Sequence, residues 1–168
     1  TTDGMLIGSR VKKGTVYLGD DGQWFENFEV SDISRVTSDR LFGVDPKGGE
    51  RAWEYNSGAI VNSTITIGDG VIYFIESRAP VAIAKAGGIQ PIQQLGDQHL
   101  VALDLRTGQP KWDRAHDFSK LQYMTYLVYA NGTLVATGTD KDKHFHTYAI
   151  AAVEEAVEAK DGKRTFVP

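Results

Sequence analysis

The sequence predicts an all-β protein built from three similar units of antiparallel strands. A strand–turn–strand motif recurs along the 168 residues, and a hairpin signature precedes each copy of it. The composition agrees, because 41% hydrophobic and 24% charged residues are ordinary values for a folded globular chain. The spacing of these repeats therefore determines the expected architecture.

The motif occurs twice with the same residue types at the same spacing. Residues 41–53 and 100–112 align without a gap, at an offset of 59 residues between the two tryptophans. The aspartate of each copy can accept hydrogen bonds from amides of the following turn, and the glycine supplies a positive φ. The tryptophan gives the next strand a large apolar face. The shared positions are Leu41, Asp45, Gly49 and Trp53 in the first copy and Leu100, Asp104, Gly108 and Trp112 in the second.

A weaker third copy is expected at residues 156–166. There Glu158 stands for the aspartate, Gly162 is kept, and Phe166 stands for the tryptophan. The overlapping segment 149–160 is rich in Ala and Glu, which favour helix over strand. Either residues 145–150 form a strand and a helix is inserted before Gly162, or the strand comes later. Of these two alternatives we expect the inserted helix.

Hairpin signals stand ahead of each copy. Asp69-Gly70 lies between two β-rich runs, and Asn131-Gly132 repeats the pattern. Both dipeptides favour two-residue turns in which the backbone takes positive φ. Residues 5–18 contain a looser first version of the same hairpin.

Each unit therefore contains four antiparallel strands, an arrangement typical of a propeller blade. The expected blades are residues 1–56, 57–115 and 116–168. Three blades do not close a ring, because propellers use roughly four to eight. We accordingly expect a partial β-propeller that is a fragment of a larger ring. Its end blades should expose apolar flanks and contact the remaining blades, another protein or a second copy.

The middle copy resembles the quinoprotein-like (PQQ-like) propeller repeat, whose blades carry the pattern Ala-x-Asp-x-x-Thr-Gly-x-x-x-Trp. In the first copy Gly43 and Gly48 replace the alanine and the threonine, and the third copy keeps only Ala156 and Gly162. The resemblance spans essentially the whole chain and implies a periplasmic or extracellular location. The residues that match every specified position of the pattern are Ala102, Asp104, Thr107, Gly108 and Trp112.

Two functions follow from the resemblance. The first is a non-catalytic binding or scaffold propeller, similar to outer-membrane assembly lipoproteins, with no cofactor. The alternative is part of a PQQ-dependent alcohol or sugar dehydrogenase, in which the quinone lies on the propeller axis near a calcium ion. The sequence contains no nucleophile elbow, phosphate-binding loop or zinc-protease motif, so no catalytic residues are assigned.

Charge and cysteine content exclude other classes of function. Lys and Arg number 18 against 22 Asp and Glu, and the resulting net charge of -4 disfavours nucleic-acid binding. The absence of Cys excludes disulfides, thiolate zinc sites and cysteine nucleophiles. No apolar run approaches the roughly 18 residues of a membrane-spanning helix.

Two long connections are candidates for ligand binding. The first, about residues 19–38, holds Trp24, Phe25 and Phe28 among carboxylates, a setting that suits a protein partner or a carbohydrate. The alternative is that these rings cover the blade edge. The second connection, about residues 78–98, is expected to contain a short helical turn before its two glycines and to cover the edge of the blade.

His144 and His146 lie two residues apart and therefore share one face of a strand. With Asp140 and Asp142 nearby, these histidines are weak candidates for a transition-metal site. A third ligand is not evident, so we expect solvated or packed imidazoles and no metal.

Overall fold

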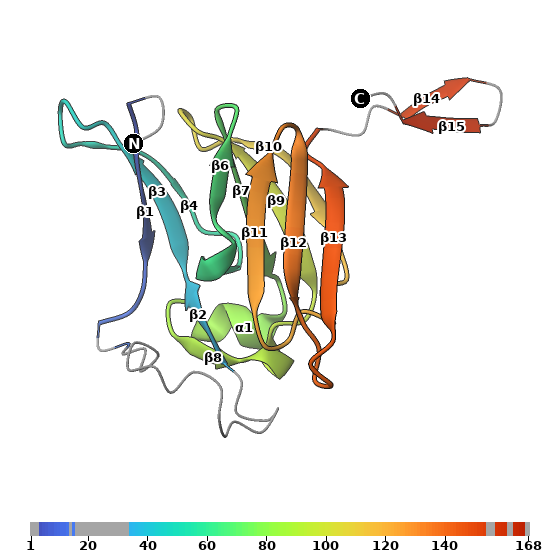
Figure 1. The fold of residues 1–168 in the computed structure, drawn as a ribbon. Helices are drawn as coiled ribbons and strands as arrows, with labels where there is room; N and C mark the ends of the chain where they lie inside the picture. Colours follow the sequence, from blue (N-terminus) through green and yellow to red (C-terminus); the bar gives the residue numbers. More distant parts are fainter. Residues whose placement is uncertain (1–3, 14, 16–33, 154–156, 161–162, 167–168) are drawn as a thin grey trace.

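The computed structural model describes residues 4–13, 15, 34–153, 157–160 and 163–166, the last two segments as backbone only. Strands dominate these residues, and every ladder is antiparallel (Figure 1). The all-β prediction is confirmed. None of the helices in the described segments is long and apolar enough to cross a membrane.

The first sheet has the order β1-β3-β4, from β1 (Leu6–Arg10), β3 (Arg40–Val44) and β4 (Arg51–Tyr55). β1 pairs directly with β3, with Leu6 opposite Val44. The expected hairpin in residues 5–18 would make residues 5–8 the first strand of the unit, with a second strand between them and β3. In the structure β1 pairs directly with β3, so β1 is the second strand of the unit and this prediction is wrong. Residues 16–18 of that hairpin lie outside the described residues.

The middle sheet contains the four-stranded unit that the repeat predicts. Three strands of this unit are β10 (Pro110–Ala115), β9 (Gln98–Asp104) and β7 (Val71–Ser77), in that order across the sheet. The fourth strand, on the other side of β7, is divided into β5 (Ala59–Val61) and β6 (Thr66–Gly68), which pair with successive halves of β7.

A short 3₁₀ turn, η2 (Asn62–Thr64), separates β5 from β6. Thr64 satisfies two backbone groups at this break in the strand. Its hydroxyl donates to the carbonyl of Val61 at 2.7 Å and accepts from the amide of Ile75 at 2.8 Å. The side chain thus replaces ladder bonds that the turn removes.

The same sheet extends further through β2 (Ser34–Ser38) and β8 (Ile89–Pro91), which the sequence did not predict. β2 pairs with β5 on one edge and with β8 on the other. Only Asp39 separates β2 from β3, so one nearly continuous extended run serves two sheets. The helical turn expected in the second long connection is present as α1 (Pro80–Lys85), followed by η3 (Ile92–Gln94).

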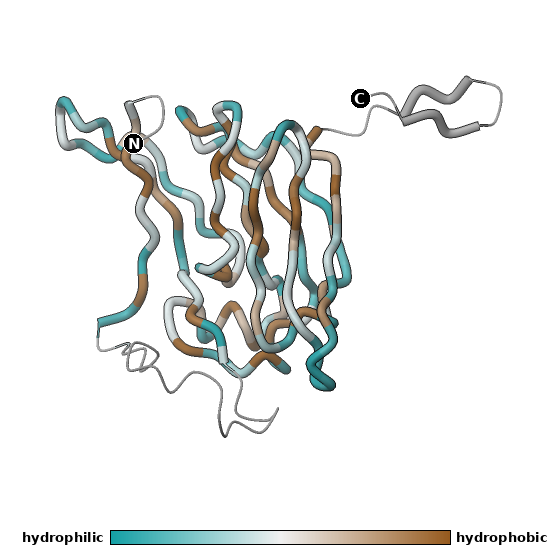
Figure 2. Tube along the Cα trace, viewed as in Figure 1, coloured by the Kyte–Doolittle hydropathy of each residue, from teal (hydrophilic) through white to brown (hydrophobic). Residues whose placement is uncertain are grey.

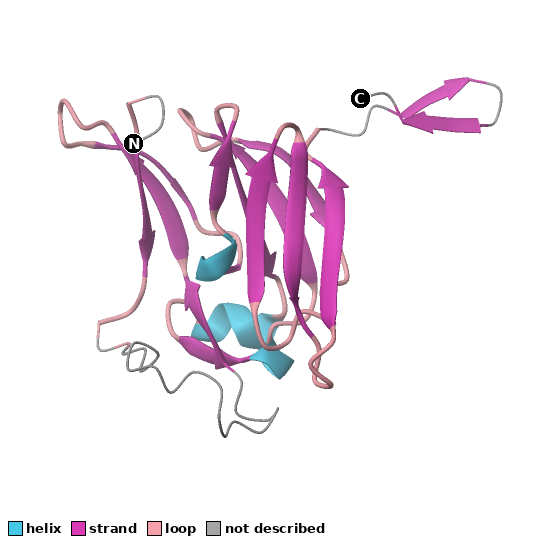
Figure 3. Ribbon diagram, viewed as in Figure 1, coloured by secondary structure: helices cyan, strands magenta, loops and turns pink. Residues whose placement is uncertain are grey.

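The third sheet has the order β11-β12-β13, from β11 (Thr125–Ala130), β12 (Thr133–Thr139) and β13 (Phe145–Ala151). β14 (Val157–Lys160) and β15 (Lys163–Phe166) pair with each other in a separate hairpin (Figure 3). The strand expected at 145–150 is present, but the inserted helix is wrong. In β13 the ladder with β12 overrides the helix preference of alanine. In β14 the ladder with β15 does the same.

Both predicted tight turns are confirmed. Asp69 and Gly70 have φ of 49° and 73°, and Asn131 and Gly132 have φ of 45° and 77°. Two consecutive positive φ values match the right-handed twist of the strands that such a turn joins. The first turn connects β6 to β7, and the second connects β11 to β12.

The core lies between neighbouring sheets, as the apolar bands of Figure 2 show. β7 is buried along its whole length, and its side chains alternate between two clusters. Ile72 and Phe74 face the first sheet, whereas Tyr73 and Ile75 face the third. Among the residues that the structure describes, the middle sheet is therefore covered on both faces, and the first and third sheets are covered on one. The four-strand count is met only in the middle unit of the described residues, and the blade boundaries stay a prediction.

Candidate functional site

The aspartate of each complete repeat organises the turn that follows it. Asp104 Oδ1 accepts from the amides of Arg106 at 3.0 Å and Thr107 at 2.9 Å, and from the Thr107 hydroxyl at 2.9 Å. The Thr107 amide is the largest of the contacts that lower the pKa of Asp104. In the first copy Asp45 accepts from the amide of Lys47 at 2.9 Å.

Trp53 joins the first sheet to the turn of the second repeat. Its indole N–H donates to the carbonyl of Leu105 at 3.0 Å, and the side chain is 8% exposed. Gly108 lies against the ring, so that a Cβ added there would stand 2.5 Å from it. Gly108 has φ of 68°, and the turn therefore needs glycine both for its conformation and for the approach of the indole.

Trp112 repeats the position of Trp53 at the edge of its sheet but not its environment. It is half-buried, its ring lies 5.8 Å from that of Tyr73, and the Arg114 guanidinium lies 4.5 Å from its centre. The place that corresponds to Leu105 in the third sheet is Ala152. The amide of Leu105 donates to Gly70, and the amide of Ala152 donates to Gly132 in the same way.

The ladder gives the same equivalence, since Val71 pairs with Asp104 and Thr133 pairs with Ala151. Ala151 is therefore the counterpart of Asp104, which corrects the assignment of Glu158 to that position. The local sequence match misled the alignment because strand pairing is set by contacts distant in sequence. Gly162 lies outside the described residues, and Phe166 ends β15, paired with Val157.

The carbonyl of Ala152, equivalent to the acceptor of Trp53, instead accepts from the Tyr73 hydroxyl at 3.3 Å. Arg114 donates to the carbonyls of Ala151 and Val153 beside it. Tyr73 and Arg114 thus take the contacts that a docked tryptophan would make.

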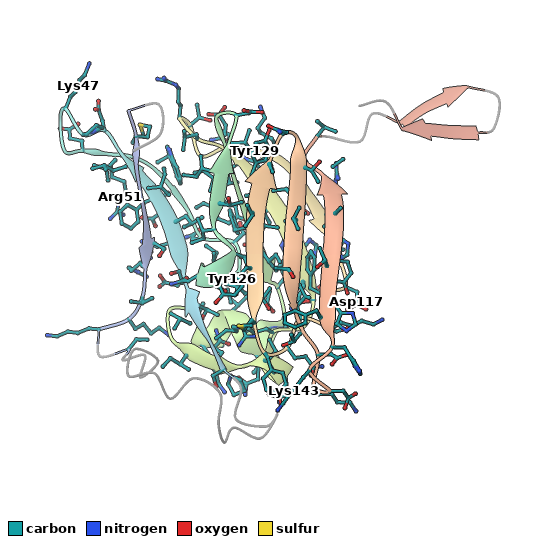
Figure 4. All side chains as sticks on the ribbon, viewed as in Figure 1. Lys47, Arg51, Asp117, Tyr126, Tyr129 and Lys143 are labelled. Atoms are coloured by element: carbon teal, nitrogen blue, oxygen red, sulfur yellow. The ribbon has the colours of Figure 1, made fainter. Side chains whose placement is uncertain are left out.

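The predicted aromatic binding residues Trp24, Phe25 and Phe28 lie outside the described residues, so their role stays a prediction. The histidines of the metal hypothesis lie near the turn between β12 and β13, whose tip carries Lys143 (Figure 4). His146 Nε2 stands 2.8 Å from Asp140 Oδ2, and His144 Nδ1 stands 3.4 Å from it. The contact with His146 is the largest cause of the lowered pKa of Asp140.

Asp140, Asp142 and His144 bring potential ligand atoms within 4.8 Å of one another. Asp140 Oδ1 already accepts from the amides of Asp142 and His144, each at 2.9 Å. The carboxylate closes the turn and holds the imidazoles, and this structural role accounts for the grouping without an ion.

The outer faces of the first and third sheets differ in charge. On the first sheet, Arg40 and Arg51 both pair with Glu54, and Arg51 lies 5.0 Å from the centre of the Phe42 ring. The three strands of the third sheet contain no Asp, Glu, Lys or Arg. We call the outward side chains of the third sheet the uncharged face, which consists of Tyr126, Val128, Ala130, Thr133, Val135, Thr137, Thr139, Phe145, Thr147, Ala149 and Ala151.

The uncharged face exposes large apolar side chains. Tyr126 is 44% exposed, Val128 54% and Phe145 77%. Strand alternation places them together, because Tyr126 and Val128 are two residues apart on β11, and their ladder partners lead across β12 to the same side of β13. A contiguous surface of this kind is typical of a protein-interaction site.

A groove of about 590 Å³ opens at the end of the middle sheet. One wall comes from residues 92–98, which include η3, and the other from residues 115–122, which begin at the last residue of β10. The sequence did not point to this groove, because no motif spans its two walls. The only available signal was the length of the second connection.

The buried carboxylate Glu76 lies at the same end of the middle sheet. It accepts from the Tyr55 hydroxyl at 2.9 Å and from Arg78 Nε at 2.8 Å, and burial raises its pKa. Arg78 also reaches Asp113 at 3.3 Å, and Asp113 lies 3.3 Å from His99 Nδ1. This network ties together β4, β7, β9 and β10.

No family model and no curated protein sequence matches the chain. Among solved structures it is similar to a europium-containing methanol dehydrogenase, with 12% identity and a TM-score of 0.45 over 70% of this chain and 21% of that one. It is also similar to BamB from Moraxella catarrhalis, with 12% identity and a TM-score of 0.27 over 71% of this chain and 47% of that one. The chain thus spans less than half the length of either.

Proposed function

We propose that the chain is a non-catalytic binding or scaffold segment of a quinoprotein-like propeller, whose docking surface is the uncharged face. The observation that carries the proposal is the composition of the third sheet, which places only uncharged side chains on an exposed three-stranded surface. A periplasmic or extracellular location belongs to the same proposal, through the resemblance of the repeat.

The chemistry of the face favours another β-sheet as its occupant. Thr, Val and Ala dominate the face, and such small and β-branched side chains interdigitate when two sheets pack. No charge has to be desolvated on this side, so burial of the face carries no ionic penalty. The opposite flank of the molecule would have to bury the ion pairs of Glu54.

The dehydrogenase alternative requires a quinone and a calcium ion held by acidic and amide side chains. In the described part of the chain, the one group of three potential metal ligands is the exposed turn of Asp140, Asp142 and His144. The oxygens of Asp140 are already engaged by amides and imidazoles. The Glu76 carboxylate is fully buried, where it accepts from Tyr55 and Arg78 and packs against Gly58. These residues do not fit the cofactor, and no catalytic step is derived through it.

The concentration dependence of the molar mass, measured by light scattering, tests the proposal. We expect the wild-type chain to self-associate through the uncharged face, and Val128→Lys to remain monomeric because it places a charge on that face. Ala52→Lys is the matched control, since Ala52 is exposed on the first sheet and gains the same charge.

A wild-type chain that stays monomeric at high concentration would contradict the proposal, as would equal loss of association in both variants. Spectroscopic titration with PQQ, with and without calcium, examines the alternative. Saturable, calcium-dependent quinone binding would favour the dehydrogenase over the scaffold.

A further inference from the structure

We propose that the free edge of β13, the side turned away from β12, accepts an extended strand of a partner protein through backbone hydrogen bonds. The added strand runs antiparallel to β13, with an acidic residue at its start and uncharged residues along its length. The proposal concerns backbone groups and not the side chains of the uncharged face, so it does not depend on the proposed function.

The pairing of β13 with β12 shows which backbone groups face the free edge. The amide of Ala152 donates to Gly132, and the carbonyl of His144 accepts from the amide of Asp140. Between these two bonds the ladder runs without a shift in register. Because the bonding direction alternates along an antiparallel strand, every second residue of β13 turns its amide and carbonyl away from β12. These outward residues are Phe145, Thr147, Ala149 and Ala151.

Most of these outward groups are unpaired. The carbonyl of Ala151 accepts from Arg114 Nη1 at 3.3 Å, which agrees with its outward direction. In the part of the chain that the structure describes, the amides and carbonyls of Phe145, Thr147 and Ala149 have no protein partner. β13 forms the outer edge of the third sheet (Figure 1), so a further strand can reach all of these groups.

Other sheet edges of the described chain are protected against strand addition. β4 and β10 carry charged residues and shift their register against their neighbours, and β8 has three residues and ends at Pro91. β11 is tied to the middle sheet, where the Ser63 hydroxyl donates to the Thr125 carbonyl at 2.7 Å. Charges, prolines, bulges and short strands are the usual protection of an edge. β13 has seven residues, no proline, no Asp, Glu, Lys or Arg, and an unshifted ladder.

The middle sheet shows how an added strand would lie. β9 is the counterpart of β13, and the equivalent edge of β9 is covered by β10, which runs antiparallel and places Trp112 opposite Ala102. The centre of β9 is buried, whereas the residues of β13 alternate between exposed and half-buried. Ala149 corresponds to Ala102 in this equivalence. An aromatic residue of the added strand would therefore lie beside Ala149.

The charges at the two ends of the edge favour another protein over a second copy of this chain. Arg114 lies at the Ala151 end, and Lys143 lies in the turn before Phe145 (Figure 4). If two copies of β13 paired antiparallel about Thr147, Lys143 of one copy would lie opposite Ala151 of the other, beside Arg114. Like charges in such a position are destabilising. A partner strand that starts with Glu or Asp brings the opposite charge to Arg114.

The test adds a capped heptapeptide, Glu-Thr-Trp-Thr-Val-Thr-Thr, to the whole chain and measures amide hydrogen exchange by NMR. In the proposed register its tryptophan lies opposite Ala149 and its valine opposite Thr147. We expect saturable binding that slows exchange of the amides of Phe145, Thr147 and Ala149 about tenfold or more. The amides of His146 and Tyr148 already bond to β12 and should change little.

N-methylation of the peptide separates edge pairing from other modes of binding. In the proposed register the amide of the valine donates to the carbonyl of Thr147, whereas the amide of the threonine before it points away from the chain. Methylation of the valine amide should weaken binding about tenfold, and methylation of that threonine amide should not.

Protein variants test the same edge. Ala149→Pro removes an outward amide that the ladder with β12 does not use, and it should weaken peptide binding about tenfold. Ala115→Pro is the matched control, because Ala115 ends β10 with an amide that points away from β9. Val128→Lys should bind the peptide as the wild type does, since Val128 lies on β11.

The proposal is overturned if the peptide does not bind saturably, if the two methylated peptides bind alike, or if Ala149→Pro binds as well as Ala115→Pro. Loss of binding in Val128→Lys would also overturn it, because the peptide would then occupy the uncharged face. Slow exchange of the edge amides without peptide would mean that another segment of the chain or a second copy already covers the edge. None of these outcomes depends on self-association, so the proposed function can fail separately.

Discussion

The ends of β9 and β13 have the same backbone hydrogen bond, but only the end of β9 carries the residues of the repeat. Both strands are followed by an amide that donates to the glycine of the preceding hairpin turn. β9 ends at Asp104, and Trp53 of the neighbouring sheet contacts Leu105 and Gly108 in the turn that follows. β13 ends at Ala151, and Ala152 follows it. The sheet therefore forms without the motif. What the motif adds is the attachment of one sheet to the next.

Replacement of the two tryptophans gives the largest expected contrast. Trp53→Ala should cost about 3–5 kcal/mol, because it empties a buried site and leaves the Leu105 carbonyl without its donor. Trp112→Ala should cost about 1–2 kcal/mol, because the half-buried ring gives up less apolar surface. Denaturant unfolding measures both changes. Equal costs would contradict the contrast between the docked Trp53 and the half-buried Trp112.

The glycines of the two turns provide the next contrast. Gly108→Ala should cost about 2–3 kcal/mol, the sum of an unfavourable positive φ and of displacement of the Trp53 ring. Gly49→Ala carries the same positive φ, but nothing lies within 4 Å of the added Cβ, and it should cost about 1 kcal/mol. Thermal unfolding separates them. A larger loss for Gly49→Ala would contradict the docking role of Gly108.

The aspartates give the smallest contrast. Asp104→Ala should cost about 1–2 kcal/mol for the loss of three hydrogen bonds, and Asp45→Ala less, since one side-chain bond is described there.

The pH dependence provides a check on the Asp104 variant. The pKa of Asp104 is lowered in the folded chain from its ordinary value of 3.8. Its stabilisation is therefore present at neutral pH and is lost as the pH falls below 3.8 and through the folded pKa. The difference in the free energy of unfolding between wild type and Asp104→Ala should shrink over that range. A difference that grows on acidification would contradict the assignment.

The sequence predicted the features that depend on neighbouring residues. Asp69-Gly70 and Asn131-Gly132 identify their turns because the φ values they need are local. The first two copies of the repeat were aligned correctly for the same reason. The third was misplaced, because its glycine and aromatic residue match the pattern while the pairing of β13 with β12 decides the true equivalence.

Features assembled from distant segments could not be predicted. The ladder of β2 with β5 and β8 joins three parts of the chain that carry no common pattern. The groove brings residues 115–122 together with residues of the preceding connection, and the two walls meet only once the backbone is placed. The uncharged face was anticipated only as an apolar flank, because the register of the three strands decides which of their side chains share one side.

The extended run through Asp39 links the stability of two sheets. Ser38 pairs with Ile60 in the middle sheet, and Leu41 pairs with Tyr55 in the first. Melting either sheet would release the end of a strand that the other needs, so their unfolding is cooperative. Proteolysis between the first two repeats would accordingly separate the two ends of one folding unit, and neither product would keep the full set of ladders.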